Sequence, residues 1–304
     1  MAARDQTEQT SAIPDQSAEA VLSERKQVSV MRLMLSNRGV FWGGLLLLVM
    51  VLLAFLAPWL TKDPMALSPI TRLKSPSAGA WFGTDQLGRD VFARVLWGAR
   101  ISLVVGLTVA VVAVSIGLLF GLIAGYIRAL DAVIMRVMDG LMAIPGILLA
   151  IALVSLSGAT LWTVIIAIVI PEIPRVVRLV RSVVLTVREE PYVEAAIAAG
   201  TRLPLVMSRH ILPNTIAPLI VQATYICGSA MILESILGFL GAGIPPEIPS
   251  WGNIMAEGRT FFQITPWIIF YPGVALAITV LAVNIVGDGL RDTLDPRIAR
   301  KMGT

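Results

Sequence analysis

Residues 101–127 read ISLVVGLTVAVVAVSIGLLFGLIAGYI and contain no Asp, Glu, Lys or Arg. As an α-helix this stretch is about 40 Å long at 1.5 Å per residue, which exceeds the roughly 30 Å of a bilayer's hydrocarbon core. The same four residue types are absent from four other long stretches, at 39–61, 140–171, 211–233 and 260–287. The sequence therefore predicts an all-α membrane protein.

The stretch 140–171 is too long for one crossing, because a straight helix of this length would measure about 48 Å. It contains a natural break at 155–160, where small and turn-forming residues (SLSGAT) cluster. Splitting there gives two helices, at 132–155 and 160–181. The predicted number of transmembrane helices is then six.

Six crossings place both termini on the same side of the membrane. The segments on that side contain 17 of the 24 Lys and Arg residues, and the opposite side contains seven. The positive-inside rule makes the richer side the cytoplasm. We expect residues 1–30, which are rich in Ser, Gln, Asp, Glu and Ala, to form a mobile cytoplasmic tail. Residues 31–300 are expected to form the six-helix domain.

The composition excludes most soluble functions. Hydrophobic residues make up 56% of the chain and charged residues 14%, against about 45–50% and about 25% in soluble domains. The net charge of +4 comes without a basic cluster interleaved with aromatic residues, which argues against nucleic-acid binding. One cysteine, Cys227, and one histidine, His210, exclude an internal disulfide and Cys- or His-rich metal sites. No lysine follows a glycine, so a Walker A nucleotide loop is absent from the sequence.

The loop at 188–213, between the fourth and fifth predicted helices, is the most informative segment. Pro191 stands at the entrance of a predicted helix at 192–199, and Gly200 supplies its left-handed end. A second short amphipathic piece follows, and Asn214 is expected to cap the fifth helix. The apolar residues of this piece are expected to share one surface: Leu203, Leu205, Val206 and Ile211. The loop therefore reads as a compact helix-turn-helix that projects from the membrane and docks on a partner.

Glu194-Ala-Ala-x-x-x-Gly200, followed after nine residues by His210-Ile-Leu-Pro-Asn214, resembles the EAA loop of ABC importer permeases. Three other stretches are similar to the C-type permease of dipeptide and oligopeptide importers. They are WFGTDQLGRDVFAR at 81–94, GFLGAGIPPEIPSWGN at 238–253 and GDGLRDTLDP at 287–296. The resemblance covers roughly residues 32–298.

The resemblance implies the type I permease fold of ABC importers, in which a cytoplasmic coupling helix docks into a cleft of an ATPase subunit. It assigns the coupling loop to Glu194, Ala195, Ala196, Gly200, Thr201, Arg202, His210, Pro213 and Asn214. It assigns the extracytoplasmic signature to Gly83, Thr84, Asp85, Gly88, Arg89 and Asp90. The family usually has Ala-Ser after the loop glycine, and Thr201-Arg202 makes the expected contact with the ATPase more basic.

The implied function is that of a permease subunit in an ATP-driven importer of dipeptides, oligopeptides or related small solutes, set in the lipid of the bacterial inner membrane. It would form half of the translocation pathway beside a homologous second permease. Two ATPase subunits and an extracytoplasmic substrate-binding protein complete the expected assembly. The chain is then no enzyme and binds no cofactor or metal, because the ATPases use the ATP and Mg²⁺. Dipeptides, longer peptides, glutathione, opines and nickel chelates stay open as solutes.

Three acidic residues in or near the predicted helices are candidates for the pathway or its gate, because intramembrane acids are costly. Asp139 and Glu172 lie three residues from Arg136 and Arg175, which predicts an ion pair along each helix. Glu234 has no local partner and is expected near the outer edge of the hydrocarbon. Two roles stay open for it, a gate residue and a hydrogen-bonded packing residue.

The segment 91–100 is expected to form an interfacial helix. Its apolar face would consist of Val91, Phe92, Val95 and Leu96. Arg89, Arg94 and Arg100 would then reach lipid headgroups.

Gly117, Gly121 and Gly125 recur at four-residue spacing on the second predicted helix. Small residues at this spacing let another helix approach closely in lipid. A packing seam within this chain is expected, with a subunit contact as the alternative.

Two other classes of function are open to a chain of this composition. An intramembrane hydrolase would pair Ser229 with His210, but about 28 Å of helix separates two groups that need a spacing of about 3 Å. An ion-coupled secondary transporter is disfavoured because the sequence shows no internal repeat. Uptake driven by an ion gradient through this chain alone would favour that third class.

Overall fold

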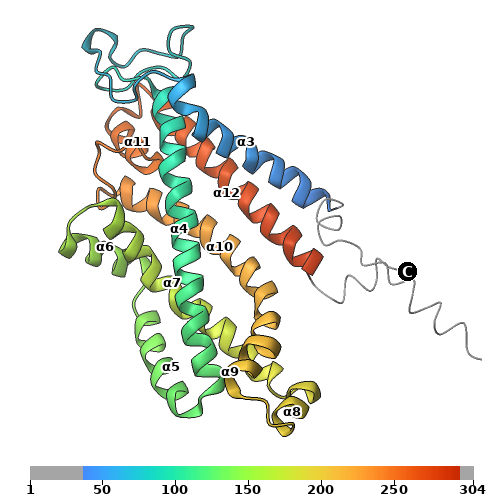
Figure 1. Cartoon of the computed structure of the whole chain (residues 1–304). Coiled ribbons are helices and arrows are strands. Elements are labelled where there is room, and N and C mark those ends of the chain that lie inside the picture. The colour runs from blue at the N-terminus through green and yellow to red at the C-terminus, as the bar shows by residue number, and fades with distance from the viewer. Residues whose placement is uncertain (1–36, 295–304) are drawn as a thin grey trace, which may run out of the picture.

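The computed structural model describes residues 37–294, and the predicted tail at 1–30 lies outside them. This part of the chain is helical, and a continuous long helix, α4, runs from one end of the molecule to the other (Figure 1). The longer helices are α3 (Arg38–Leu60), α4 (Val91–Tyr126), α5 (Arg128–Met142), α6 (Gly146–Ser157), α7 (Leu161–Val187), α10 (Leu212–Phe239) and α12 (Trp267–Leu294). The shorter ones are η1 (Pro69–Thr71), α8 (Pro191–Ala198), α9 (Leu203–Val206), the π-type turn η2 (Met207–Ile211), α11 (Trp251–Gly258) and η3 (Arg259–Phe261).

Four helices in the described range are long and apolar enough to cross a membrane, against the six that the sequence predicts. They are α3, α4, the continuous run Leu203–Phe239, and Trp267–Thr293 of α12. The bent pair α5–α6 makes a fifth if it is taken as one broken crossing. The remaining predicted crossing, the fourth along the chain, is α7, which brings Glu172, Arg175 and Arg178 into its first 18 residues. The all-α membrane fold is confirmed, and the structure supports four or five apolar spans.

A sharp elbow replaces the straight helix predicted at 132–155. α5 and α6 meet at 85°, across a short break that contains Pro145. Proline lacks an N–H and disfavours helical backbone at the residue before it, here Ile144, so α5 ends just before this point, at Met142. The second break, predicted at 155–160, is confirmed. There Thr160 caps α7 by accepting a hydrogen bond from the N–H of Thr163 at 3.1 Å.

The expected interfacial helix at 91–100 is instead the first part of α4. Asp90 caps this helix by accepting a hydrogen bond from the N–H of Phe92 at 2.9 Å, and the helix then continues to Tyr126 without a break. No proline separates the two parts, and the helix passes through Gly98. A charge-free stretch marks only the section of a helix that can lie in lipid, so it misses the charged turns at the helix end.

The glycine seam on α4 packs against α7 of the same chain, as predicted. A Cβ atom on Gly117, Gly121 or Gly125 would collide with Val176, Val180 or Val184, respectively. The valines are fully buried, and the contact forms the centre of the largest apolar core. The close approach fixes α4 and α7 as one unit.

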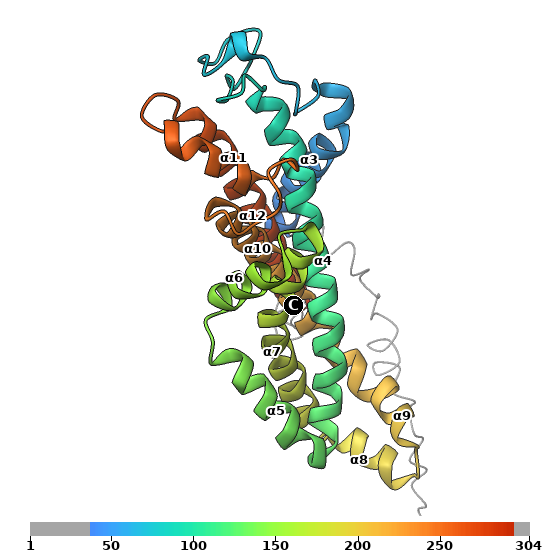
Figure 2. The same cartoon turned by 90° about the vertical axis from the view of Figure 1, so that its left-hand side faces the viewer.

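The two ends of the molecule differ in character. α3 and α12 lie side by side, and the segment at 61–90 gathers with α11 at one end (Figures 1 and 2). The short helices α8 and α9 lie at the opposite end (Figures 1 and 2). α4 is the helix that extends between the two ends (Figure 1).

Candidate functional site

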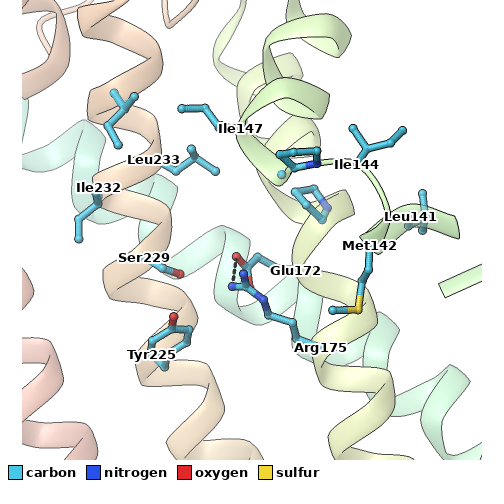
Figure 3. Close-up of a pocket in the computed structure, with 14 residues that line it drawn as sticks. Leu141, Met142, Ile144, Ile147, Glu172, Arg175, Tyr225, Ser229, Ile232 and Leu233 are labelled. Carbon is cyan, nitrogen blue, oxygen red and sulfur yellow. Dashed lines mark hydrogen bonds and ion pairs between the residues drawn. The ribbon is translucent and has the colours of Figure 1, made fainter. Parts of the chain in front are cut away.

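A pocket of about 460 Å³ lies between α10, α7 and the α5–α6 elbow (Figure 3). The proline-containing elbow turns α6 away from α5 and so leaves this space open between the three elements. Most of its walls are apolar, and a small polar group is set into them. The polar side chains are Glu172 and Arg175 on α7 and Tyr225 and Ser229 on α10. The other lining residues are Leu141, Met142, Ile144, Pro145, Gly146, Ile147, Pro171, Ile232, Leu233 and Ile236.

Glu172 and Arg175 form the ion pair that their spacing predicts. Nη1 of Arg175 donates to both carboxylate oxygens of Glu172, at 3.0 and 3.1 Å. The Glu172 side chain is 8% exposed and that of Arg175 is 48% exposed. Both residues line the pocket (Figure 3). The pair therefore has one buried member and one that extends into the open space.

Asp139 does not pair with Arg136, its predicted partner on the same helix. It accepts a hydrogen bond from Nη2 of Arg178 on α7, at 2.6 Å. One helical turn further, Arg181 holds Asp131 with two hydrogen bonds of 2.6 Å. Arginines at three-residue intervals on α7 thus tie α5 to it, a long-range pairing that local spacing does not reveal. Asp139 itself does not line the pocket.

In the segment 188–213 the first helix and its glycine end form as the sequence predicts. α8 begins at Pro191, and Gly200, with φ +79°, ends its last turn. Glu194 and Ala195 are exposed on α8, and Ala196 is partly exposed. Large apolar side chains also reach solvent here: Tyr192, Ile197, Leu203 and Leu205. Val206 and Ile211 are instead buried, so the four apolar residues expected to share one surface divide between the core and an exposed face.

Asn214 does not cap α10, because no new helix starts there. The chain runs from α9 through a π-type turn into α10, and Pro213 lies within this run. Proline removes one N–H and crowds the preceding turn, which the wider π turn accommodates. The amide of Asn214 donates to the carbonyl oxygen of His210 at 2.6 Å and to the hydroxyl of Tyr192 at 3.2 Å. Thr201 and Arg202 belong to the short link at 199–202 between α8 and α9.

A buried ionic cluster holds the opposite end together. Arg94 is 0% exposed, and its guanidinium donates to Asp85 at 2.8 Å and to Glu257 on α11 at 2.6 and 3.0 Å. Arg89, also buried, donates to the same two carboxylates. The expectation that Arg89 and Arg94 reach headgroups is therefore wrong. Local sequence patterns do not reveal the role of Glu257, because Arg89 and Arg94 lie 168 and 163 positions away from it.

The remaining signature residues build the turn that presents Asp85. Gly83 and Gly88 have positive φ and enclose it, and Thr84 accepts a hydrogen bond from the N–H of Lys74 at 2.9 Å. Asp85 also accepts the N–H of Arg89 at 3.0 Å. The signature at 83–90 therefore has a structural role: it joins the 61–90 segment to α11 through the buried ionic cluster.

Glu234 lies outside the pocket and is 0% exposed. Ser102 on α4 donates to its Oε2 at 3.1 Å, and the Ser235 hydroxyl lies 3.4 Å from the same oxygen. Within residues 37–294, Oε1 has no hydrogen-bond partner. The sequence misses Ser102 because the contact joins two helices 132 positions apart.

The hydrolase alternative finds no support in the geometry. The Ser229 hydroxyl donates to the carbonyl oxygen of Ile226 at 3.1 Å, within its own helix. His210 lies in the π-type turn at the far end of the same run and packs near the ring of Tyr192. No hydrogen bond in the described part of the chain joins Ser229 to His210.

Residues 117–300 match the family described as binding-protein-dependent transport system inner membrane component. The chain belongs to this family. As a member of it, the protein is a multi-pass membrane permease subunit of an ABC importer, as the EAA-like loop predicts. The matched residues include α7, the pocket, the α8–α9 segment and α10.

The permease has relatives that align over most of their length. A probable peptide ABC transporter permease protein of Sinorhizobium fredii is 58% identical over 90% of this chain and 94% of its own. The dipeptide transport system permease protein DppC of Alkalihalophilus pseudofirmus is 44% identical over 86% of this chain and 87% of its own.

The fold of the permease is also similar to that of a chain in a solved structure of the MetNI methionine ABC transporter in an inward-facing conformation. The TM-score is 0.50 and the sequence identity is 21%, over 69% of this chain and 95% of the other. This likeness concerns the fold, and it confirms the type I importer permease architecture.

Proposed function

We propose that this permease imports dipeptides or closely related short peptides. The observation that carries the proposal is its alignment along nearly the whole chain with permeases of peptide and dipeptide transport systems. The pocket supports it, because apolar walls with a single carboxylate–guanidinium pair suit a small solute that carries both charges.

The exposed α8–Gly200–α9 segment is the proposed coupling element. Its exposed apolar side chains would be covered by an ATPase subunit, since a contiguous apolar patch in water marks an interaction site. Glu194, Ala195, Ala196, Thr201 and Arg202 would lie at or beside this contact. Two such ATPases would bind and hydrolyse ATP with Mg²⁺, and the permease itself would bind neither.

The same proposal fixes the orientation in the membrane. The α8–α9 end would face the cytoplasm together with both termini, in agreement with the distribution of Lys and Arg. The 61–90 segment and α11 would face outward and receive a substrate-binding protein. A second, homologous permease would complete the pathway beside this chain.

Reconstitution of the complete assembly tests the proposal. Proteoliposomes that contain both permeases and both ATPases, with the binding protein added to the substrate side, should accumulate labelled dipeptide only when ATP and Mg²⁺ are present. An ATPase with its nucleotide-binding lysine replaced serves as the matched control and should abolish uptake.

Two outcomes would overturn the proposal. Absence of dipeptide uptake by the intact assembly would remove the substrate class. Uptake driven by an ion gradient in vesicles that hold only this chain would instead support a secondary transporter.

A further inference from the structure

The Glu172–Arg175 pair is only half enclosed. Glu172 is buried in the wall of the pocket, whereas nearly half of the Arg175 side chain is exposed. Both hydrogen bonds between them leave from Nη1 of Arg175. Because a guanidinium carries five N–H donors, Nε and Nη2 can still bind a second carboxylate in a forked geometry.

The ion pair also removes the energetic cost of burying the Glu172 carboxylate, and it does so without filling the pocket. A buried carboxylate without a partner is strongly destabilising, and it is costlier still at membrane depth. Arg175 neutralises Glu172 from the same helix, so the wall is stable when the pocket contains no solute. A zwitterion that enters can then exchange one ion pair for two, with no net charge moved into lipid.

The spacing of the two residues selects the length of the zwitterion. Residues three apart on a helix have Cβ atoms about 5–6 Å apart, and both side chains are long enough to diverge from there. The terminal ammonium and carboxylate of an extended dipeptide are about 7 Å apart at about 3.3–3.6 Å per residue. Four residues would separate them by about 13–14 Å, which exceeds the reach of this pair.

We propose that Glu172 binds the terminal ammonium and Arg175 the terminal carboxylate of a transported dipeptide within the membrane. This inference rests on the proposed peptide import. Tyr225 and Ser229 stand on the opposite wall and offer hydroxyls to the peptide bond (Figure 3). The remaining walls are apolar and contact the variable side chains of the peptide. They distinguish poorly between different side chains, since methylene contacts discriminate weakly. The permease thus selects for two free termini and a short backbone, and tolerates the sequence.

Equilibrium binding to the complete permease–ATPase complex tests the inference. The complex is placed in nanodiscs without the binding protein, so that the ligand can bind only to the membrane site. Labelled alanyl-alanine is displaced by the same dipeptide, by its N-acetylated form and by its C-terminal amide. The wild-type complex should bind the free dipeptide about tenfold or more tightly than either blocked form, because each loses a charged hydrogen bond.

Two single variants separate the termini. Glu172→Gln should abolish the preference over the N-acetylated form and keep the preference over the amide, and Arg175→Met should do the reverse. Each leaves its former partner unpaired, so Glu172→Gln/Arg175→Met serves as the well-assembled variant and should lose both preferences. Arg178→Met removes a cation one turn along α7, outside the pocket, and should keep both.

The outcomes distinguish this inference from the proposed function. If the wild-type assembly imports dipeptide but its membrane site shows no preference for free termini, the inference fails and peptide import stands. Equal weakening of all three ligands by each variant would assign the pair a purely structural role. If the intact assembly imports no peptide, the proposed function itself fails.

Discussion

The side-chain amide of Asn214 donates a hydrogen bond to the hydroxyl of Tyr192, 3.2 Å away, and so joins α8 to the first turn of α10. Asn214 also binds the carbonyl oxygen of His210. The exposed helix α8 is therefore attached by side chains to the helix that carries Tyr225 and Ser229 into the pocket. A displacement of α8 would therefore be transmitted through these hydrogen bonds to α10, which forms one wall of that pocket.

Tyr192→Phe is expected to weaken the connection between α8 and α10, because it removes the hydroxyl that binds Asn214 and leaves the ring in place. The lost hydrogen bond is worth about 0.5–1.5 kcal/mol, so α8 should be held less firmly to α10 and more ATP should be hydrolysed per peptide imported. Parallel assays of hydrolysis and uptake measure this ratio. Ser208→Ala, which removes an exposed hydroxyl from the adjoining turn, is the control and should change nothing. An unchanged ratio in Tyr192→Phe would contradict the role of the contact.

Gly200→Val should uncouple transport while the chain remains in the membrane. The backbone at Gly200 has φ +79°, and a β-branched residue there costs about 1–3 kcal/mol. A Cβ at this position meets no atom within 4 Å, so the cost is one of backbone conformation alone. Gly200→Asn, which tolerates left-handed backbone, should retain coupling. Normal uptake by Gly200→Val at wild-type abundance would refute the assignment of the coupling loop.

Arg94→Met should strongly destabilise the end of the molecule that contains α11. It leaves Asp85 and Glu257 with one cation between them, and breaking a buried ion pair costs about 3–5 kcal/mol. A thermal unfolding series of the purified complex, read through a fluorophore at the α11 end, measures the loss. Lys74→Met removes an exposed cation from the same end and should be neutral. Equal stability of the two variants would show that the cluster contributes little.

The orientation predicts opposite labelling of two positions. Single cysteines at Ser77 and Ser208, placed in a Cys227→Ala background, should react with an impermeant thiol reagent from opposite sides of the membrane. Both positions are exposed. Ser77 should label in intact cells and Ser208 only in inverted vesicles. Labelling of both from one side would refute the proposed topology.

Glu234 offers a test between a gate residue and a packing residue. The amide oxygen of Glu234→Gln can still accept from Ser102, so we expect normal assembly and normal transport. Glu234→Ala should lose about 1–3 kcal/mol of stability, because it strands the buried hydroxyl. Melting curves and uptake assays on both variants decide the matter. Altered basal ATPase activity in Glu234→Gln, with assembly intact, would instead favour the gate.

Local sequence patterns predicted the features that depend on local chemistry. Charge-free stretches located α3, much of α4 and α12, and most of α10. Gly200, Thr160 and the Glu172–Arg175 spacing correctly gave a helix end, a helix start and an ion pair. Each of these depends on residues within five positions of one another, where helix geometry leaves few alternatives.

The errors concern relationships between distant residues. The prediction that Arg94 reaches headgroups is wrong chiefly because Arg94 binds Glu257, 163 positions away, in addition to Asp85, nine positions away. Asp139 was paired along its own helix because Arg178 lies on another. The pocket itself follows from the α5–α6 elbow at Pro145, which hydropathy does not register, since proline interrupts an apolar stretch without adding charge.

The same elbow constrains how the protein is made. α6 spans about 18 Å, too short to cross the membrane by itself, and α5 carries Asp131 and Asp139. The arginines that neutralise these acids, Arg181 and Arg178, are synthesised 50 and 39 residues later. At about 5–20 residues per second, α5 waits roughly 2–10 seconds for its counter-charges. These two ion pairs can form only after α7 has been synthesised, so α5 reaches its final packing against α7 later than its own synthesis.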